Sequence, residues 1–252
     1  MSLLSLARDL KRRKGRERRS LFITEGVRAV EELVRSPLVV RGVLITPELL
    51  DGARGSALEA LIAGRGITIE RVDERELASA ADTESPQGVV AVAETPDHQL
   101  SSIPLGGLAR LVILDGIQDP GNAGTILRTA AALGARGVVA LPGTVDLWNA
   151  KVVRGAMGVH FRFPLVQATH DELFGLLASA SIALWGAAAE GEAISGLKSP
   201  ERLAIALGNE GAGLSPAVRD RCDVLVSIPI DPAVESLNVA VAAGIILHEL
   251  RG

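Results

Sequence analysis

The feature that most constrains the fold is an alternation of short apolar segments with segments of helical periodicity. Four segments in the first hundred positions are short and rich in β-branched residues, as strands are. Segments whose apolar side chains recur with helical spacing separate them. The strands are expected at 21–24, 39–46, 67–72 and 88–93, and the helices at 25–35, 56–63 and 73–80. The alternation predicts a small α/β domain.

Residues 96–108 interrupt this alternation. The segment contains Pro96, Pro104, Gly106 and Gly107 together with two serines, which is the composition of a linker. We therefore expect a first domain over residues 1–95 and a second over residues 109–252. The length of 252 residues suits two such domains, since a domain usually has roughly 100–200 residues.

The alternation resumes after the linker. Its strands contain few polar residues, which is typical of a parallel sheet covered by helices on both faces. The strands are expected at 111–114, 137–141, 182–187, 203–207 and 224–228, and the helices near 123–133, 149–157, 171–180 and 236–250. The second domain is therefore predicted to be a larger, doubly wound α/β domain.

Composition excludes several classes of protein. Apolar residues make up 48% of the chain and charged residues 22%, so a disordered chain is excluded. The longest uninterrupted apolar stretch, residues 239–247, is too short for a membrane-spanning helix, which needs about twenty residues. Cys222 is the only cysteine, so no internal disulfide forms and a reducing cytoplasm is expected. No histidine or cysteine pair has zinc-ligand spacing, so no metal site of that kind is expected.

The strongest charge pattern is a basic segment near the N-terminus. Residues 8–19 hold eight basic side chains against two acidic ones, although the formal net charge of the chain is −4. Such a segment on an acidic protein is typical of a contact with a polyanion, and a solvated helix face is the alternative. Arginine predominates in it, and arginine binds phosphate through paired donors. The basic residues are Arg8, Lys11, Arg12, Arg13, Lys14, Arg16, Arg18 and Arg19.

Three loops of the second domain are rich in glycine and polar residues, and each follows a predicted strand. Ligands of open α/β sheets bind beyond the carboxyl ends of the strands. The first loop leads through Gly121, Asn122 and Gly124 into a helix that carries Arg128. Free backbone N–H groups at such a helix start hold anions, and an asparagine-capped helix is the structural alternative. The dinucleotide and P-loop glycine patterns are both absent.

The second and third loops follow the strands at 203–207 and 224–228. The second carries three glycines and Glu210, and glycine lets a backbone approach a flat ligand such as an adenine ring. A turn capped by Ser215 is the alternative, but it leaves Glu210 unexplained. The third carries Ser236 and Asn238 at the start of a helix with an uncharged body, which predicts burial in the core or against a partner subunit.

Taken together and in this order, the three loops resemble the SpoU (TrmH-type) family of RNA ribose 2′-O-methyltransferases, within the SPOUT superfamily. The matching words are Asn122 with Arg128, then Leu-Gly-Asn-Glu-Gly at 207–211, then Ile-Pro at 228–229 followed by Ser-Leu-Asn-Val at 236–239. The resemblance covers residues 109–252. The first domain also resembles the small α/β substrate-binding domain often fused ahead of that family's catalytic domain, on Phe-Ile-Thr-Glu-Gly-Val-Arg at 22–28.

The resemblance implies a fold and a set of partners that the residue pattern alone does not. It implies a catalytic domain whose C-terminal segment threads a loop into a deep trefoil knot, with S-adenosyl-L-methionine bound in the knotted loops. It also implies a homodimer with the active site at the subunit interface. The expected substrate is structured RNA, with ribosomal RNA favoured over transfer RNA. No metal and no membrane are expected to take part.

Residue roles follow from the same resemblance. The residues expected around the reacting ribose are Asn122, Arg128, Glu210, Ser236 and Asn238. The residues expected to hold the cofactor are Ala187, Leu207, Gly208, Ile228 and Leu237. The basic segment becomes the expected RNA contact, and Arg128, which is always protonated, becomes a clamp on the adjacent phosphate.

Two departures and three alternatives remain. Ala240 stands where relatives often carry a hydroxyl residue, and Glu235 stands where many have a small one. The alternatives to methylation of ribosomal RNA are methylation of a transfer RNA ribose, methylation of a base, and a non-catalytic RNA-binding protein with the same fold. A nicotinamide-dependent oxidoreductase is disfavoured because its glycine fingerprint is missing.

Overall fold

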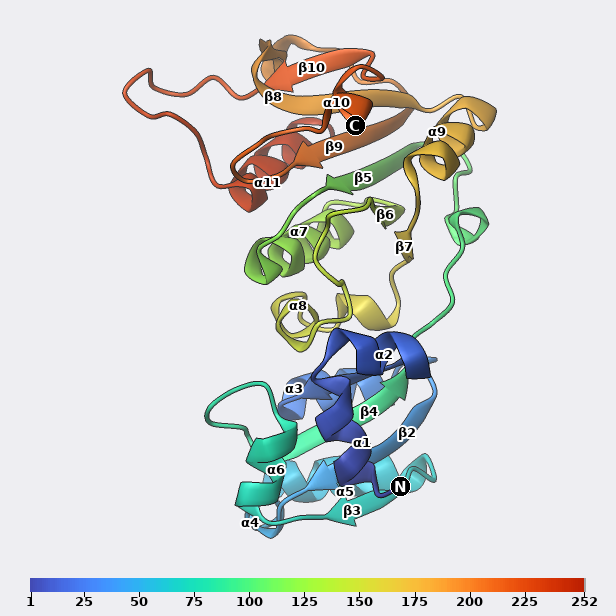
Figure 1. Ribbon diagram of the computed structural model, residues 1–252, viewed down its shortest axis with the longest axis vertical. Helices are drawn as coiled ribbons and strands as arrows, with labels where there is room; N and C mark the ends of the chain where they lie inside the picture. Colours follow the sequence, from blue (N-terminus) through green and yellow to red (C-terminus); the bar gives the residue numbers. More distant parts are fainter. Residues whose placement is uncertain (252) are drawn as a thin grey trace. The chain divides into compact units, whose positions relative to one another are not determined.

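The computed structural model describes residues 1–251 and divides into two compact units (Figure 1). The first unit comprises residues 1–97 and 148–162, and the second comprises residues 98–147 and 163–252. The chain therefore crosses between the units three times. The predicted fold class is confirmed, because the chain has a parallel sheet in its larger unit and a smaller α/β unit ahead of it.

The first unit is a four-stranded sheet between two layers of helices. Its strand order is β1-β4-β2-β3, with β4 antiparallel to both neighbours and β3 parallel to β2. The strands are β1 (Leu21–Glu25), β2 (Val40–Ile45), β3 (Ile69–Arg71) and β4 (Val89–Glu94). The helices are α1 (Leu3–Leu10), α2 (Arg13–Arg19), α3 (Val27–Val34), α4 (Pro47–Leu50), α5 (Ala53–Gly64), α6 (Glu74–Ala80) and α8 (Ala150–Gly155).

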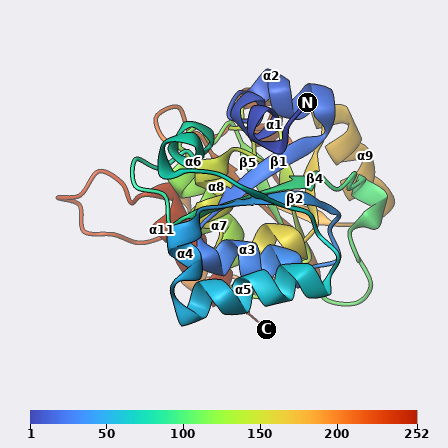
Figure 2. The ribbon, with the colours of Figure 1, turned by 90° about the horizontal axis from the view of Figure 1, so that it is seen from below.

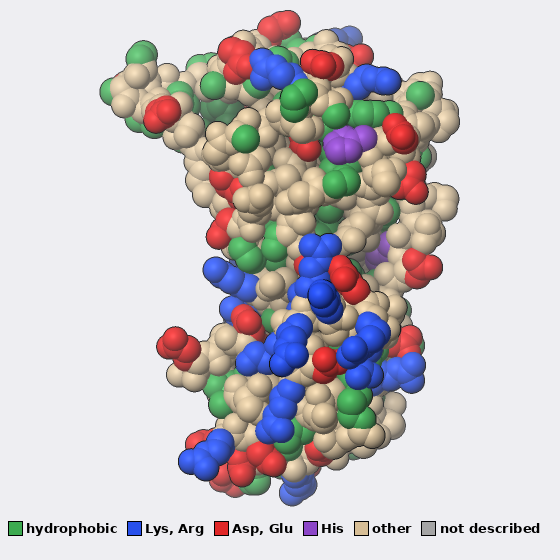
Figure 3. Space-filling view, viewed as in Figure 1, with side chains coloured by type: hydrophobic (Ala, Val, Ile, Leu, Met, Phe, Trp, Pro, Cys, Tyr) green, Lys and Arg blue, Asp and Glu red, His purple; other side chains and the backbone are tan. Residues whose placement is uncertain are grey.

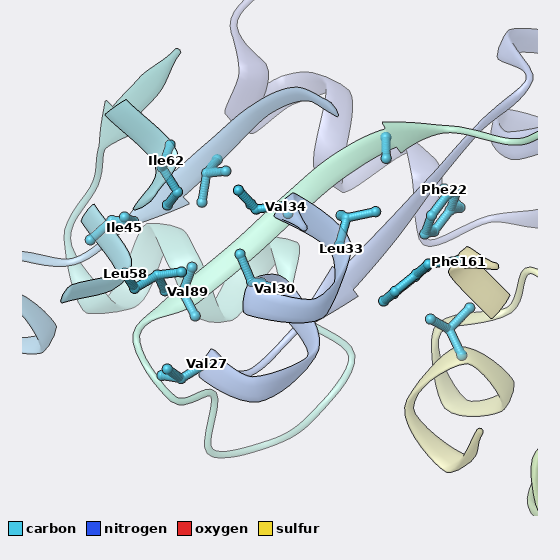
Figure 4. Close-up of a cluster of buried hydrophobic side chains, with 14 of the residues drawn as sticks. Phe22, Val27, Val30, Leu33, Val34, Ile45, Leu58, Ile62, Val89 and Phe161 are labelled. Atoms are coloured by element: carbon cyan, nitrogen blue, oxygen red, sulfur yellow. The ribbon is translucent and has the colours of Figure 1, made fainter. Parts of the chain in front are cut away.

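Each face of this sheet has its own apolar core, because successive strand side chains point to opposite faces. Figure 2 shows α3 and α5 on one face and α1 and α6 on the other. The core on the α3 side includes Val30, Leu33 and Ile62, which are fully buried (Figure 4). The core on the α1 side includes Leu10 and Leu77. The sequence predicts the helix α6 well, since Asp73 caps it through a capping box with Glu76.

Residues 148–162 depart from the expected division, in which residues 109–252 form one contiguous domain. They leave the second half of the chain after β6 and pack on β1 of the first unit. The rings of Trp148 and Phe161 have centroids 4.6 and 6.0 Å from that of Phe22. Figure 4 shows Phe161 beside Phe22. Arg154 adds an ion pair to the buried carboxylate of Glu25 at 2.5 Å. The first unit's core is therefore completed by a segment distant in sequence.

The second unit is built on a six-stranded sheet in which every pair of neighbouring strands is parallel. The strand order is β10-β8-β9-β5-β6-β7. The strands are β5 (Ala109–Asp115), β6 (Gly137–Ala140), β7 (Leu165–Gln167), β8 (Ala183–Ala193), β9 (Arg202–Gly208) and β10 (Val224–Ser227). The short strand β7 has no counterpart among the predicted strands. Every residue of β5 is buried, as expected of a central strand covered on both faces.

Helices cover both faces of this sheet. The helices are α7 (Pro120–Ala132), α9 (His170–Ser179), α10 (Pro216–Arg219) and α11 (Val239–Glu249). Helix α9 contributes Leu173 and Leu177 to the core on one face, and α7 packs against α11. The single-turn helix α10 begins at Pro216 after the cap Ser215. The trefoil knot stays a prediction.

Helix α11 begins at Val239 rather than at the predicted Ser236, because the side chain of Asn238 accepts hydrogen bonds from the backbone N–H groups of Ala240 and Val241 in its first turn. Within the single chain the helix is not buried all round, since the side chains of Val241 and Ile245 are 52% and 36% exposed. The buried side of α11 therefore contains only some of its apolar side chains. Burial of the exposed side against a partner subunit stays a prediction.

Candidate active site

The carboxylate of Glu210 joins the second of the three loops singled out in the sequence to the first. Strands β5 and β9 are parallel neighbours, so the loops that follow them begin at the same edge of the sheet. Glu210 lies just after β9. Its carboxylate accepts hydrogen bonds from the backbone N–H groups of Gln118 and Asp119, at 3.2 and 3.1 Å, and from Nδ2 of Asn122 at 3.0 Å. The second loop is thereby tied to the first.

The third loop joins the same network through two asparagines. Nδ2 of Asn238 donates to Oδ1 of Asn122 at 2.9 Å, while Oδ1 of Asn238 caps α11. Asn122 therefore accepts from the third loop and donates to Glu210 of the second. The chain Glu210–Asn122–Asn238 links three segments that are far apart in the sequence, and all three are predicted site residues.

The charge of Glu210 is set by this network. Partial burial raises the pKa of its carboxyl group, but the hydrogen bonds from Asn122 and from the backbone of Asp119 and Gln118 outweigh burial. The net result is a pKa below the ordinary glutamate value, so the group is a carboxylate at neutral pH. Its observed hydrogen bonds are with the first loop and not with Arg128.

Two supporting residues were not predicted from the sequence. Asp115, at the end of β5, is buried and accepts a hydrogen bond from the backbone N–H of Ser215 at 2.6 Å. Asn209 donates to the carbonyl of Gly116 at 2.8 Å, and its Oδ1 accepts from Gly211 and Ala212. Both side chains fix the shape of the second loop. A polar residue at the end of an otherwise apolar strand is the signal that points to Asp115.

A cavity of about 510 Å³ lies beside this network, within the second unit. All five residues expected to hold the cofactor line it, and so do Glu210, Ser236 and Asn238. Asn122 and Arg128 are not among its lining residues. The expected cofactor residues come from β8, the end of β9, the segment after β10 and the loop before α11, and are Ala187, Leu207, Gly208, Ile228 and Leu237.

Strand β8 loses its ladder partners beside the cavity. Strand β8 pairs with β9 only as far as Gly186 opposite Ala206. Pairing of β8 with β10 is also interrupted, since Leu225 lies opposite Gly186 while Val226 lies opposite Glu192. Residues 187–191 of β8 thus have no ladder partner on β9 or β10. Residues 187–189 of this unpaired stretch line the cavity.

Gly208 lies where the second loop folds back against β9. A Cβ atom at this position would lie 2.2 Å from the carbonyl carbon of Gly213 and 2.3 Å from the backbone nitrogen of Leu214. Contacts that short do not occur, so a larger residue would force the loop away from the strand end. Glycine is therefore required here for the close approach that shapes the cavity wall.

The polar lining of the cavity fits S-adenosyl-L-methionine, which presents a flat adenine and a positively charged sulfonium. Three carboxylates line the cavity, those of Glu210, Asp231 and Glu235, and no lysine, arginine or histidine does. The other lining residues include Leu207, Ile228 and Leu237, which offer apolar contact to a ring. An acidic lining with apolar walls suits a cationic ligand better than an anionic one.

The structure does not bring Arg128 or Ser236 into the hydrogen-bonded network. Arg128 lies on α7, six residues after Asn122, and its side chain is exposed. Ser236 is exposed in the loop before α11. Neither side chain has a hydrogen bond or ion pair with another residue of the described chain, 1–251. Both are available to a substrate or a partner subunit.

The basic segment forms α2 and the end of α1. Asp9 accepts from Arg18 and Arg19, and the two arginines hold the pKa of that carboxyl below its usual range. Arg16 is different from the rest of the segment: it is 6% exposed, and its guanidinium donates to the carbonyls of Leu10 and Lys11 at the end of α1. The expectation that Arg16 contacts RNA does not fit this burial, because its charged head closes a helix end.

The other basic side chains of the segment reach the surface. Arg8 donates to the hydroxyl of Ser79, and Arg13 pairs with Glu17 in the next turn. Figure 3 shows lysine and arginine side chains gathered over this part of the first unit. The exposed members are Arg8, Lys11, Arg12, Arg13, Lys14 and Arg18, with Arg19 partly exposed.

No helix within residues 1–251 is long and apolar enough to cross a membrane. No cluster of three or more histidine, cysteine, aspartate or glutamate side chains in the same range has the arrangement of a metal site.

The second unit has a parallel sheet with polar loops at its strand ends and a cavity lined by those loops, and a smaller α/β unit accompanies it. These features define a ligand-binding α/β protein. The chain belongs to the SpoU rRNA methylase family, whose model matches residues 109–248. A second model, described as an MRM3-like substrate-binding domain, matches residues 5–91. The recognised resemblance is thus confirmed.

Similar proteins with known names cover almost the whole chain. The chain is 34% identical over 246 residues to the 23S rRNA (guanosine(2553)-2′-O)-methyltransferase RlmP of Bacillus subtilis, covering 97% of this chain and 94% of that protein. It is 33% identical to the 23S rRNA (uridine(2479)-2′-O)-methyltransferase of Streptomyces viridochromogenes, covering 94% and 84%.

A solved structure agrees with these relatives. The SpoU methyltransferase AviRb of S. viridochromogenes, in complex with the cofactor AdoMet, matches with a TM-score of 0.88 and 30% sequence identity. The match covers 99% of this chain and 97% of that one. Both units are therefore part of the shared architecture.

Proposed function

We propose that this chain is an S-adenosyl-L-methionine-dependent RNA methyltransferase that modifies a ribose 2′-hydroxyl of ribosomal RNA. The observation that carries the proposal is the joining of three loops by Glu210, Asn122 and Asn238 beside an acidic, apolar-walled cavity. The relatives named above are 23S rRNA 2′-O-methyltransferases, and they favour ribosomal over transfer RNA. Because one acts on guanosine and the other on uridine, the base at the target is left open.

The cavity residues hold the cofactor in this proposal. The backbone around Leu207, Gly208, Ile228 and Leu237 takes the adenine, and Ala187 lines the same cavity. Glu210, Asp231 and Glu235 favour a ligand of positive charge. The bound cofactor supplies the methyl group as an electrophilic carbon on a sulfonium. No metal is required, because the charge on sulfur is lost as the methyl group leaves.

The remaining site residues position the ribose. The 2′-oxygen forms its bond to the methyl carbon as the carbon–sulfur bond breaks, and the hydroxyl proton passes to the adjacent phosphate or to water. Asn122 and Asn238 lie at the rim and orient the ribose, while Glu210 keeps Asn122 in place. Alignment of the two reacting atoms is the main contribution expected of such a site.

Arg128 and Ser236 are assigned to the substrate because they are exposed and without partners in the described chain. The guanidinium of Arg128 clamps the phosphate beside the target ribose and stabilises negative charge that develops on the 2′-oxygen. Ser236 adds a hydrogen bond to the ribose. The basic residues of α1 and α2, without Arg16, hold more distant phosphates.

A homodimer is part of the proposal. Four apolar side chains of α11 and of the loop before it are exposed, which a monomer rarely tolerates as a cluster. These residues are Ile230, Val234, Val241 and Ile245, with exposed fractions of 36, 48, 52 and 36%. A second copy of the chain would cover them and bring its own loops to the substrate. A cytoplasmic enzyme is expected, where ribosomal RNA is available.

The test is a methyl-transfer assay on unmodified ribosomal and transfer RNA transcripts with labelled S-adenosyl-L-methionine. After digestion to nucleosides, mass spectrometry identifies the labelled product. The proposal predicts a 2′-O-methylnucleoside from ribosomal RNA. A labelled base, or label only in transfer RNA, contradicts the proposed reaction or substrate. Binding of RNA and cofactor without any transfer, on transcripts and on ribosomal subunits alike, identifies a non-catalytic RNA-binding protein.

A further inference from the structure

The first unit contains a cavity of about 760 Å³ that is separate from the cofactor cavity and takes no part in the proposed chemistry. Every residue that lines it belongs to the first unit. Its walls come from the end of β1, the first turns of α3, the start of α5, the loop before β4, and α8 with the turn after it. Its volume lies within the roughly 300–1,000 Å³ typical of small-ligand sites.

One buried carboxylate holds three of these walls together. Glu25 is 7% exposed, and its Oε2 accepts hydrogen bonds from the backbone N–H groups of Asp82 and Thr83 at 2.9 and 3.4 Å. Its Oε1 accepts from Arg154 of α8 at 2.5 Å. The end of β1, the loop before β4 and α8 are thus fixed around the cavity by a single side chain. The cavity is therefore a built feature of the fold.

Three glutamates and three arginines line the cavity, so their charges balance in number, but the arginines are not equally paired. Arg154 is neutralised by Glu25 and Asp82, and Glu32 pairs with Arg162 at 2.8 Å. Arg54 has only a long contact of 3.5 Å with Glu31. Arg28 is exposed and makes no hydrogen bond or ion pair within residues 1–251.

The cavity therefore offers one free guanidinium and one loosely held guanidinium, and both can take a phosphate. The same walls carry neutral hydrogen-bonding groups on Thr83, Ser85 and Gln87, and a thioether on Met157. Amide and hydroxyl groups can read the edge of a base, while guanidinium planes and thioethers stack on its face. A phosphate site beside such groups matches one nucleotide unit.

We propose that this cavity binds a single unpaired nucleotide of the RNA substrate, away from the methylated ribose, with its phosphate on Arg28 and Arg54. The proposal rests on the proposed function, because it takes the substrate to be RNA. The match of residues 5–91 to a substrate-binding domain model supports the assignment to this unit. Recognition of RNA sequence generally uses such unstacked bases in loops and bulges, so the site provides discrimination that the basic segment cannot.

The test uses the full-length wild-type protein and three variants of it. Arg28→Ala removes the free guanidinium. Glu31→Gln releases Arg54 from its only carboxylate contact and so acts in the opposite direction. Arg75→Ala is the matched control, since Arg75 lies on α6, is exposed and has no partner in the described chain. Neither Arg28 nor Arg75 supports the fold through a contact, so both variants should fold normally.

The measurement is the fluorescence anisotropy of a labelled single-stranded RNA dodecamer of mixed sequence, titrated at several salt concentrations. Arg28→Ala should weaken binding by about tenfold and reduce the slope of log affinity against log salt by about 0.7, the loss of one phosphate contact to a single strand. Glu31→Gln should tighten binding, and Arg75→Ala should leave it unchanged. An Arg28→Ala variant that binds like the Arg75→Ala control overturns the inference.

Competition with small probes identifies which kind of ligand the cavity binds. Guanosine or uridine monophosphate should displace the RNA from the wild-type protein and not from Arg28→Ala. If inorganic phosphate competes as well as the mononucleotides, the cavity is only an anion site and the nucleotide assignment fails. The methyl-transfer assay separates the two proposals. Normal transfer with unaltered RNA binding by Arg28→Ala rejects this inference alone, while absence of transfer by the wild-type protein, with RNA binding that Arg28→Ala weakens, rejects the proposed function alone.

Discussion

The cavities described above in the two units differ in charge and are held together by different means. The cavity of the second unit is lined by three carboxylates and no cation. The cavity of the first unit is lined by three arginines and three glutamates, and the same unit carries the basic segment. A methyltransferase of this kind must bind a cationic cofactor and a polyanionic substrate. In the proposed function the cofactor lies in the second unit beside the reacting ribose, while the more distant phosphates of the RNA are held by the first unit.

The two regions also differ in what fixes their geometry. In the second unit, Glu210, Asn122 and Asn238 tie strand-end loops together by hydrogen bonds among neutral amides and one carboxylate. In the first unit, the buried Glu25 and its ion pair with Arg154 hold a segment that is distant in sequence. Substitutions in the second unit should therefore act mainly on chemistry, and those at residues 148–162 mainly on stability.

The largest expected effect is on methyl transfer, through Arg128. Arg128→Ala should lower kcat by about 10² to 10³, as loss of one charge-stabilising donor does elsewhere. Its affinity for S-adenosyl-L-methionine should stay within about twofold of wild type, because Arg128 does not line the cavity. Single-turnover transfer and calorimetric cofactor titration measure the two quantities. Loss of cofactor affinity in this variant would contradict the assignment of Arg128 to the RNA rather than to the cofactor.

The next effect is on stability, through Phe161. Phe161→Ala should destabilise the protein by about 3–5 kcal/mol, because it removes a fully buried ring that stacks near Phe22. Phe163→Ala is a useful control, since that side chain is only partly buried and belongs to the second unit. Urea unfolding followed by circular dichroism measures both. Equal, small losses for the two variants would mean that residues 148–162 do not complete the core of the first unit.

The smallest effect is a pH dependence at Glu210. Its pKa lies below the ordinary value in the folded state, so the carboxylate contributes stability above the unfolded-state pKa. That contribution is lost as the pH falls through the folded-state pKa. Glu210→Gln should therefore unfold at a lower temperature than wild type at pH 7, and the difference should shrink on acidification to about pH 3. A difference that is constant with pH would show that the network does not depend on the charge.

Much of the second unit could be predicted because its information is local. Apolar strands, the cap and proline at Ser215 and Pro216, and polar loops after each strand all follow from short stretches of sequence. Parallel strands then bring those loops to one edge, where Asn122, Glu210 and Asn238, which the family resemblance assigned to one site, are joined by hydrogen bonds. The start of α11 was misplaced at Ser236 because two residues could cap it, and only the contact with Asn122 selects Asn238.

The features that were missed depend on distant contacts. Nothing in residues 148–162 indicates that Trp148 and Phe161 pack on Phe22 rather than on the second unit. The missing ladder pairs of residues 187–191, beside the cavity of the second unit, are likewise set by the register of β8 with its neighbours. Burial of Arg16 follows from a bend between two helices and not from its position in a run of charges.

The central claim is that cofactor and RNA are bound by separate parts of the chain, and two variants test it directly. Ala189→Lys puts a cation at the exposed edge of the cofactor cavity, with Ala189→Gln as its control for size. The second variant replaces Arg12, Arg13, Lys14 and Arg18 with glutamine. Both affinities are measured on each, by calorimetry for S-adenosyl-L-methionine and by anisotropy for RNA.

We expect each variant to change one of the two affinities and to keep the other. Ala189→Lys should lose cofactor affinity and keep RNA affinity. The variant with four glutamines should bind RNA with a salt slope reduced by roughly three and keep its cofactor affinity. Loss of both affinities in either variant would contradict the division of binding between the two units.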